Sequence, residues 1–177
     1  MQDIPQINRY NFRTLTQVLS RPGESGSLLP AFGSYVLGCG SVLLFSQVSY
    51  CNLTNEDFSL LDSLTRSKKA ECAGADYVFT QSLESSLLDS VKRGSFKEPE
   101  FSASLIYCHK GDEEFNYVLK GPGIKRSKEA SYPLEPALAR QFVELNKEFP
   151  IGFEMYFLHM ANGAIKALSR TTHLEVV

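Results

Sequence analysis

The pattern that most constrains this chain is a pair of apolar segments separated by a tight turn near its end. Pro150 and Gly152 interrupt any preceding helix, and residues 153–160 form an aromatic and apolar run suited to a buried strand. Asn162-Gly163 favours a type I′ turn, because both residue types tolerate positive φ. Residues 164–169 are then the returning strand, so the sequence predicts a buried β-hairpin.

Four polar residues follow this hairpin, namely Arg170, Thr171, Thr172 and His173. In an extended tail, Leu174 and Val176 face one way, and Thr171, His173 and Glu175 face the other. Arg170 would share the face of the apolar residues, which favour burial. We therefore expect Arg170 to need a carboxylate or phosphate close by. Glu154, which interrupts the apolar strand, needs a partner for the same reason.

The rest of the chain alternates helices and strands before hairpins dominate. Thr54 is expected to cap the third helix, and residues 110–113 have the composition of a hairpin turn between the strands on either side. This order predicts one domain, residues 1–177, with a three-layer α-β-α fold around a mixed sheet. The expected helices cover 8–19, 35–47, the segment after Thr54 up to the basic residues 66–69, 82–92 and 136–147, and the expected strands cover 48–53, 76–80, 101–109 and 115–120.

Charge and composition exclude several classes of function. The formal charge of −2 gives no electrostatic reason to propose a nucleic-acid partner. No apolar run reaches the ~20 residues that a membrane-spanning helix needs, and the polar start of the chain does not resemble a signal peptide. A cytoplasmic protein is therefore expected. The four cysteines show no paired spacing, which favours buried free thiols over two disulfides and argues against a zinc site, so no metal is expected.

Two polar segments are candidate binding sites. The arginine fork and hydroxyls of residues 169–173 can bind a phosphate or phosphonate oxygen, or they can dock a partner protein. Docking is favoured, because no nucleophile-and-base pair accompanies these residues. The turn at Gly121 and Gly123 could hold an anion on its backbone N–H groups with help from Lys125 and Arg126, although a plain tight turn is favoured.

A pyridoxal cofactor would need a Schiff-base lysine and an acidic partner for its ring nitrogen. Lys166 lies in the hairpin and is the residue one could imagine in that role. No glycine-rich phosphate cup leads to it. No cofactor and no autonomous active site are therefore expected.

Three stretches together resemble one known family. They are FRTLTQVLSRPG (residues 12–23), LKGPGI (119–124) and SRTTHLEV (169–176), the last following an FPIG-initiated hairpin. They resemble the H subunit of the bacterial carbon–phosphorus lyase core complex. The resemblance implies the fold of the large domain of pyridoxal-phosphate-dependent transferases without the cofactor site. It also implies a homodimer, as do the apolar helix 35–47 with Gly38 and Gly40 and the aromatic strand 153–160.

The resemblance further implies a role beside other core subunits in phosphonate utilisation. That complex joins a phosphonate to the ribose of ATP with release of adenine, giving alpha-D-ribose 1-phosphonate 5-triphosphate. A separate radical iron–sulfur subunit later cleaves the carbon–phosphorus bond. The alternatives are an autonomous pyridoxal- or nucleotide-dependent enzyme on the same fold, or a scaffold unrelated to phosphonates.

Overall fold

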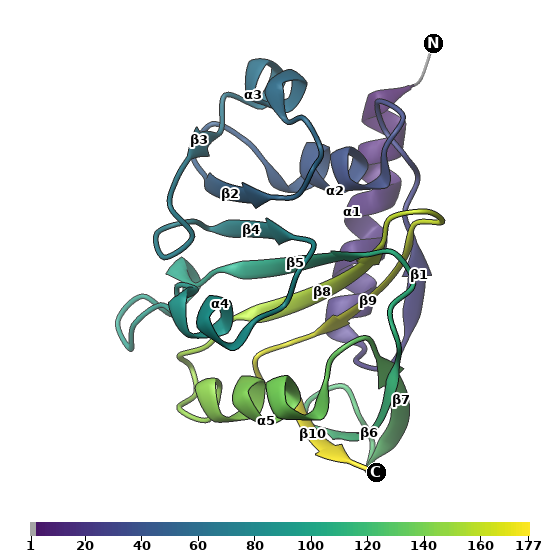
Figure 1. Cartoon of the computed structure of the whole chain (residues 1–177), viewed down its shortest axis with the longest axis vertical. Helices are drawn as coiled ribbons and strands as arrows, with labels where there is room; N and C mark the ends of the chain where they lie inside the picture. The colour runs from purple at the N-terminus through teal and green to yellow at the C-terminus, as the bar shows by residue number, and fades with distance from the viewer. Residues whose placement is uncertain (1–2) are drawn as a thin grey trace.

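The hairpin expected at residues 153–169 lies inside a seven-stranded sheet (Figure 1). A computed structural model describes residues 3–177 of the chain. The strand order is β1-β9-β8-β5-β4-β2-β3, in which β3, β2, β4, β5 and β8 are parallel and β9 and β1 are antiparallel to their neighbours. The strands are β1 (Ser25–Ser27), β2 (Ser49–Leu53), β3 (Lys68–Lys69), β4 (Tyr77–Thr80), β5 (Ser104–His109), β8 (Glu154–His159) and β9 (Ala164–Leu168).

Helices cover both faces of this sheet, so the expected layered α/β architecture is confirmed. Helices α1 (Ile4–Ser20), α2 (Tyr35–Leu43) and α3 (Ser59–Thr65) contribute to one apolar cluster. Helices α4 (Ser85–Ser90) and α5 (Pro136–Leu145) contribute to the cluster on the opposite face. In Figure 1, α1 runs behind the strands while α4 and α5 lie in front of them. A short 3-10 helix, η1 (Pro99–Phe101), precedes β5.

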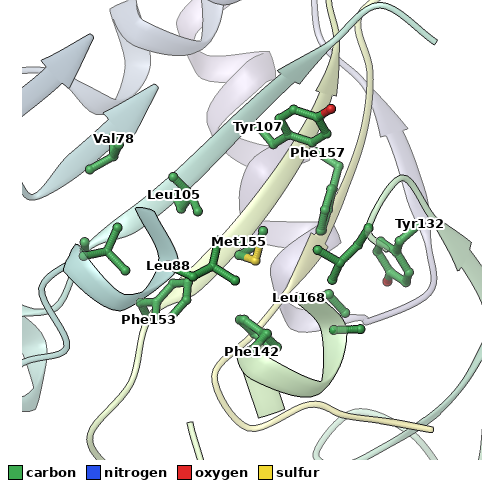
Figure 2. Close-up of a cluster of buried hydrophobic side chains, with 14 of the residues drawn as sticks. Val78, Leu88, Leu105, Tyr107, Tyr132, Phe142, Phe153, Met155, Phe157 and Leu168 are labelled. Atoms are coloured by element: carbon green, nitrogen blue, oxygen red, sulfur yellow. The ribbon is translucent and has the colours of Figure 1, made fainter. Parts of the chain in front are cut away.

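The central strands supply both clusters because successive side chains of a strand point to opposite faces. Phe79 and Ile106 lie in the cluster beneath α1 and α2, whereas their neighbours Val78 and Leu105 lie in the cluster beneath α4 and α5. Figure 2 shows the second cluster, in which Phe142 of α5 stands against the sheet. Its ring meets that of Phe153 edge to face, with the centroids 5.4 Å apart. The sheet is therefore buried on both sides, as parallel sheets usually are.

A second, three-stranded sheet is antiparallel and has the order β10-β6-β7. It comprises β6 (Phe115–Lys120), β7 (Lys128–Tyr132) and β10 (His173–Val176). The expected pairing of β5 with β6 as a hairpin is wrong, because β5 pairs with β4 and β8 in the large sheet. The burial of the two strands explains the difference. Nearly every residue of β5 is buried, which suits a central parallel strand. Along β6 more buried and more exposed residues alternate, so one face of that strand contacts solvent.

Two local details also differ from expectation. The turn between β8 and β9 is not type I′, because Gly163 has a φ of 74° while Asn162 is not among the residues with positive φ in the described chain. Four residues, 160–163, connect the strands, and loops of that length are usually built on other turns. Helix α3 begins at Ser59 without a side-chain cap, since Thr54 instead accepts and donates hydrogen bonds in a turn with Asn52 and Glu56.

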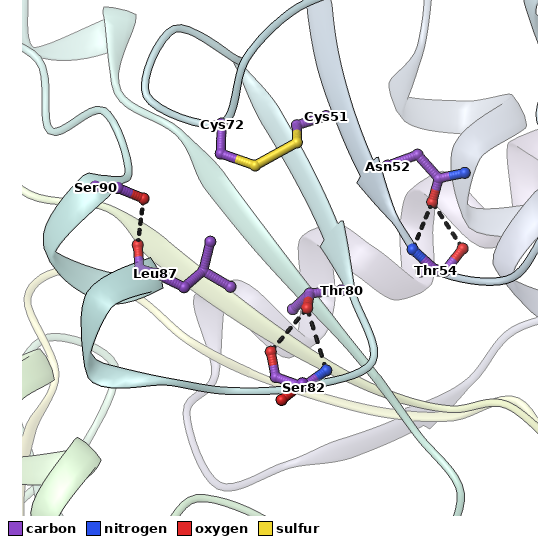
Figure 3. Close-up of a disulfide and its surroundings, with 8 residues drawn as sticks. All are labelled: Cys51, Asn52, Thr54, Cys72, Thr80, Ser82, Leu87 and Ser90. Carbon is purple, nitrogen blue, oxygen red and sulfur yellow. Dashed lines mark hydrogen bonds between the residues drawn. A yellow bond between two sulfur atoms is a disulfide. The ribbon is translucent and has the colours of Figure 1, made fainter.

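The cysteines also depart from the expectation of four free thiols. Cys51 of β2 and Cys72, in the segment before β4, form a disulfide (Figure 3). Their separation of 21 residues carries no motif, so the pairing could not be deduced from spacing. It arises because β2, β3 and β4 are neighbours in the sheet, which brings the two Cα atoms to 5.2 Å. Cys39 and Cys108 are free and buried, as expected.

Helix α2 packs closely against other elements of the same chain. A Cβ at Gly38 would lie 2.6 Å from the carbonyl oxygen of Leu29, and one at Gly40 would lie 2.6 Å from a methyl carbon of Leu61. The apolar surface of α2 and of β8 is thus covered within the chain, so it gives no separate argument for a dimer. None of the helices in the described part of the chain is both long and apolar enough to cross a membrane.

Candidate functional site

Three turns from distant parts of the chain meet at one corner of the molecule, and we call this place the turn corner. It comprises residues 20–23, 121–126 and 169–173. A Cβ at Gly121 would lie 2.6 Å from the carbonyl oxygen of Thr171, and one at Gly123 would lie 2.7 Å from that of Ser20. Both glycines have positive φ, 136° and 82°, which disfavours any side chain there. The predicted site residues at 121–123 and 171–173 are therefore brought together.

A buried tyrosine fixes the first of these turns. The backbone N–H of Gly23 donates to the hydroxyl of Tyr132 at 2.9 Å, and that hydroxyl donates to the carbonyl of Ala167 at 3.2 Å. Burial raises the pKa of Tyr132 to about 12, so the hydroxyl keeps its proton at neutral pH. Tyr132 thereby ties the end of α1 to β7 and β9.

Arg170 points away from the turn corner into a partly buried ion pair. Its Nε donates to Oε1 of Glu154 at 2.7 Å, and the two side chains are 17% and 16% exposed. Its other nitrogens donate to the carbonyls of Pro99 and Pro150 and to the hydroxyl of Ser102. The expectation that Arg170 and Glu154 each need a partner is confirmed, and they are each other's partner. The extended geometry assumed for Arg170 is wrong, because residues 169–172 form a turn closed by the bond from Thr172 N to Ser169 O.

The two threonines of this turn are bonded to the same hydroxyl. Oγ of Ser169 lies 3.0 Å from Oγ1 of Thr171 and 2.9 Å from Oγ1 of Thr172. Thr172 is buried, whereas Thr171 is partly exposed. The main role of these hydroxyls is therefore to stabilise the turn. The carbonyl oxygen of Thr171 occupies the space that a side chain at position 121 would need.

Among the predicted site residues, His173 is the one with an exposed side chain. It begins β10, where it lies opposite Lys120 of β6, so the two side chains share one face. Lys120 also reaches Glu175 at 2.7 Å on that face, while Leu174 lies opposite the buried Leu119. The alternation predicted for residues 173–176 is confirmed by the register, but Val176 stays 45% exposed where burial was expected. His173 is exposed and available to a partner molecule.

The turn at Gly121 and Gly123 is followed by two positively charged residues. Lys125 and Arg126 follow the Gly121–Gly123 turn, and both are exposed. Within residues 3–177 neither forms an ion pair or a side-chain hydrogen bond. Such a surface can bind an anion or an acidic protein surface.

A second polar cluster, which the sequence did not reveal, lies where β5 and β8 end. His109 and His159 are register partners in adjacent parallel strands, and their ring centroids are 5.1 Å apart. Burial and the neighbouring His159 lower the pKa of His109, which favours its neutral form. Each histidine closes an expected strand, so two apolar strands that both end in histidine are the signal that could have indicated the pair. His173 does not join them.

The tautomer of each neutral histidine ring follows from its backbone contact. Nδ1 of His109 accepts from the N–H of Gly111 at 3.4 Å, and Nδ1 of His159 accepts from that of Ala161 at 3.2 Å. In the neutral ring the proton then lies on Nε2, which makes Nε2 a donor rather than a metal ligand. Among residues 3–177, no group of three or more potential ligands could hold a metal ion. In the same range, no serine, threonine or cysteine donates to a histidine.

Lys166 lies close to this pair and is already bound within the chain. Its Nζ donates to both oxygens of Glu114 and to the carbonyl of Ser131, each at 2.9 Å. Burial alone would raise the pKa of Glu114, but the hydrogen bonds from Ser131 and Lys166 outweigh it and hold that pKa below its usual range. An ion-paired lysine is a charged amine and a poor nucleophile.

These features define a mixed α/β protein whose three distant turns build a polar, cation-bearing corner. A family model described as bacterial phosphonate metabolism protein (PhnH) matches residues 1–175. The chain belongs to this family, so the resemblance seen in the three stretches is confirmed. A search of curated proteins finds no match to the chain.

Proposed function

We propose that the chain is the H subunit of a carbon–phosphorus lyase core complex in phosphonate utilisation. In this role it supports formation of alpha-D-ribose 1-phosphonate 5-triphosphate from ATP and a phosphonate and has no autonomous active site. The observation that carries the proposal is the meeting of all three family-like stretches at the turn corner. A common partner that contacts all three turns would explain why turns far apart in the sequence lie together in the structure.

The turn corner is the surface through which the subunit contacts the rest of the complex. Outward-facing His173, Lys125 and Arg126 supply donors and positive charge. Arg170 contributes indirectly, since its bonds to Glu154, Pro99 and Pro150 hold the turn that presents His173. A partner with a carboxylate-rich surface would complement these groups.

The fold is that of the large domain of pyridoxal-phosphate-dependent transferases without a cofactor site. Support comes from the parallel strands at the centre of the large sheet and from Lys166, whose amine pairs with Glu114. The protein acts in the cytoplasm as one domain spanning residues 1–177. On its own it forms a homodimer, a state that we carry over from the family. Tyr10 and Phe12 of α1, which are 47% and 61% exposed, offer apolar surface for such an interface.

Complementation of a deletion strain tests the proposal. The variant His173→Ala should keep the melting temperature and oligomeric state of the wild type, because the side chain is exposed. It should nevertheless weaken growth on phosphonate and recovery of the other core subunits in a pull-down. Lys68→Ala is the matched control, since Lys68 is an exposed basic residue on the opposite edge strand β3.

Three results would each refute a part of this assignment. Full complementation and normal partner binding by His173→Ala would show that the turn corner has only a structural role. Steady phosphonate cleavage or ATP hydrolysis by the isolated chain, abolished by a point mutation in it, would show an autonomous enzyme. A monomer mass by light scattering at micromolar concentration would contradict the homodimer.

A further inference from the structure

Two adjacent parallel strands of the large sheet send their connections to opposite faces. After β2 the chain continues to α3, which packs with α1 and α2 on one side, and after β4 it continues to α4 on the other side. Leu53 and Thr80, the last residues of β2 and β4, are register partners. Where connections diverge in this way, a crevice opens outside the carboxyl ends of the strands, and open α/β sheets bind ligands there.

An open surface cavity of about 390 Å³ lies at this divergence point, and most of the residues that line it are exposed. Its volume falls within the usual range for small-molecule sites. Figure 3 shows how Thr80 and Ser82 at the end of β4, Leu87 and Ser90 of α4, and the disulfide surround the same space. The residues that line the cavity are Leu53, Cys72, Thr80, Ser82, Glu84, Ser86, Leu87 and Ser90. None of them lies in the turn corner.

The lining combines hydroxyl groups, one carboxylate and an apolar wall, and no lysine or arginine contributes to it. Within the described chain, the hydroxyls of Ser82 and Ser86 and the carboxylate of Glu84 form no hydrogen bond with another residue. Leu53 remains 50% exposed at the mouth. A carboxylate without a neighbouring cation repels phosphate and accepts hydrogen bonds from vicinal sugar hydroxyls.

The wall that carries these groups is firmly held. Thr80 is 2% exposed, and its hydroxyl donates to the carbonyl of Ser82 at 2.7 Å while accepting from the N–H of Ser82 at 3.1 Å. These two bonds set the direction of the chain as it leaves β4. On the other side, the disulfide between Cys51 and Cys72 joins β2 to the segment before β4. The backbone on two sides of the cavity is thus fixed before any ligand arrives, which lowers the entropic cost of binding.

We propose that this cavity binds an uncharged ribonucleoside, with the sugar hydroxyls on Glu84, Ser82 and Ser86 and the base against Leu53 and Leu87. The inference does not rest on the proposed function, since the cavity shares no residue with the turn corner. The carboxylate selects against a phosphate on the ligand. The apolar wall selects a nucleoside over a free sugar, because a sugar lacks a flat face to bury.

Calorimetry and NMR titration of the full chain test this site with adenosine, adenine, ribose and AMP as probes. Adenosine should bind most tightly and shift the methyl signals of Leu53, Thr80 and Leu87. Glu84→Gln should weaken adenosine about tenfold, because a charge-assisted hydrogen bond is lost. Glu84→Lys should reverse the preference and favour AMP.

Two bulky variants separate the site from the fold. Ser86→Trp should fill the cavity and abolish adenosine binding, whereas Ser85→Trp, on the same helix but outside the lining, should leave it unchanged. Both serines are exposed, so both variants should fold. The proposal is overturned if AMP or ribose binds as tightly as adenosine, if adenosine shifts no signal within its solubility, or if the two tryptophan variants behave alike.

Discussion

Replacing Arg170 with alanine is expected to destabilise the protein by about 3 kcal/mol. Removing one partner of a buried ion pair costs about 3–5 kcal/mol, because the other charge is left without compensation. Glu154 is 16% exposed, so some water can reach the orphaned carboxylate, and we take the lower end of that range. The carbonyls of Pro99 and Pro150 also lose their donor, which makes a much smaller effect unreasonable.

Urea unfolding and thermal melts measure this effect. For a chain of 177 residues, 3 kcal/mol corresponds to a decrease of about 6–12 °C in melting temperature. Arg126→Ala is the matched control, since Arg126 is exposed and forms no ion pair within residues 3–177, and it should change stability by no more than about 0.5 kcal/mol. The reasoning is refuted if Arg170→Ala is as stable as Arg126→Ala.

A double-mutant cycle separates the ion pair from the other bonds of Arg170. Once Glu154→Ala has removed the carboxylate, Arg170→Ala should cost less than it does in the wild type. The two single changes should therefore be non-additive by about 1–3 kcal/mol. Additive effects would place the stabilisation in the contacts to Pro99, Pro150 and Ser102 instead.

Three further predictions concern the turns, the disulfide and the histidine pair. Gly121→Ala should cost about 2 kcal/mol or more in unfolding free energy, because the alanine would have positive φ and its Cβ would clash with a carbonyl oxygen. Gly74→Ala is the control and should be near neutral, since a Cβ there would meet only a carbonyl oxygen 3.8 Å away. Equal costs for the two variants would contradict the geometry of the turn corner. Replacing Cys51 and Cys72 with serine should cost about 3 kcal/mol for a loop of 21 residues, and a reducing agent should lower the stability of the wild type alone. The pKa of His109 is lower in the folded chain, so as the pH falls the unfolded chain is protonated at this residue first. The stability contributed by neutral His109 is therefore present above pH ~6.5 and is lost as the pH falls through the folded pKa. His109→Gln should flatten the dependence of unfolding free energy on pH in that window, and an unchanged slope would show that other groups cause it.

The hairpin and the tail could be read from the sequence because both depend on local patterns. The apolar run and the glycine at the turn were enough to place β8 and β9, even though the type of turn differed. Alternation was enough to orient His173 and Leu174. The alternation of side chains along a strand depends only on neighbouring residues. Such predictions therefore require no knowledge of the rest of the fold.

Strand partners were the part that local pattern could not give. The turn composition at residues 110–113 is compatible with a hairpin, yet β5 and β6 belong to different sheets. Whether a strand is buried on one face or on both determines which sheet it joins. That burial depends on helices that occur later in the sequence. The same reason hides the disulfide and the histidine pair, since both join residues that only the strand order makes adjacent.

The candidate site was predicted in part. The sequence indicated the polar segment at 170–173 and the glycine turn at 121–123, and the structure brings these two segments together. It could not indicate that Arg170 would turn inward to Glu154 while His173 remained outside, because that split depends on a tight turn at Ser169. Polar residues in a row look alike until the backbone direction between them is known.

The pairing of β1 with β9 has a consequence for biosynthesis. Residues 25–27 are synthesised well before residues 164–166, so they have no strand partner until that later segment has been made. Strands β2, β4 and β5 emerge in order and can pair as they appear, whereas the surface against which α1 packs is completed only when β9 arrives. Nascent chains should therefore expose the apolar face of α1 until β9 has been made. Contacts of such long sequence separation slow folding and favour capture by chaperones.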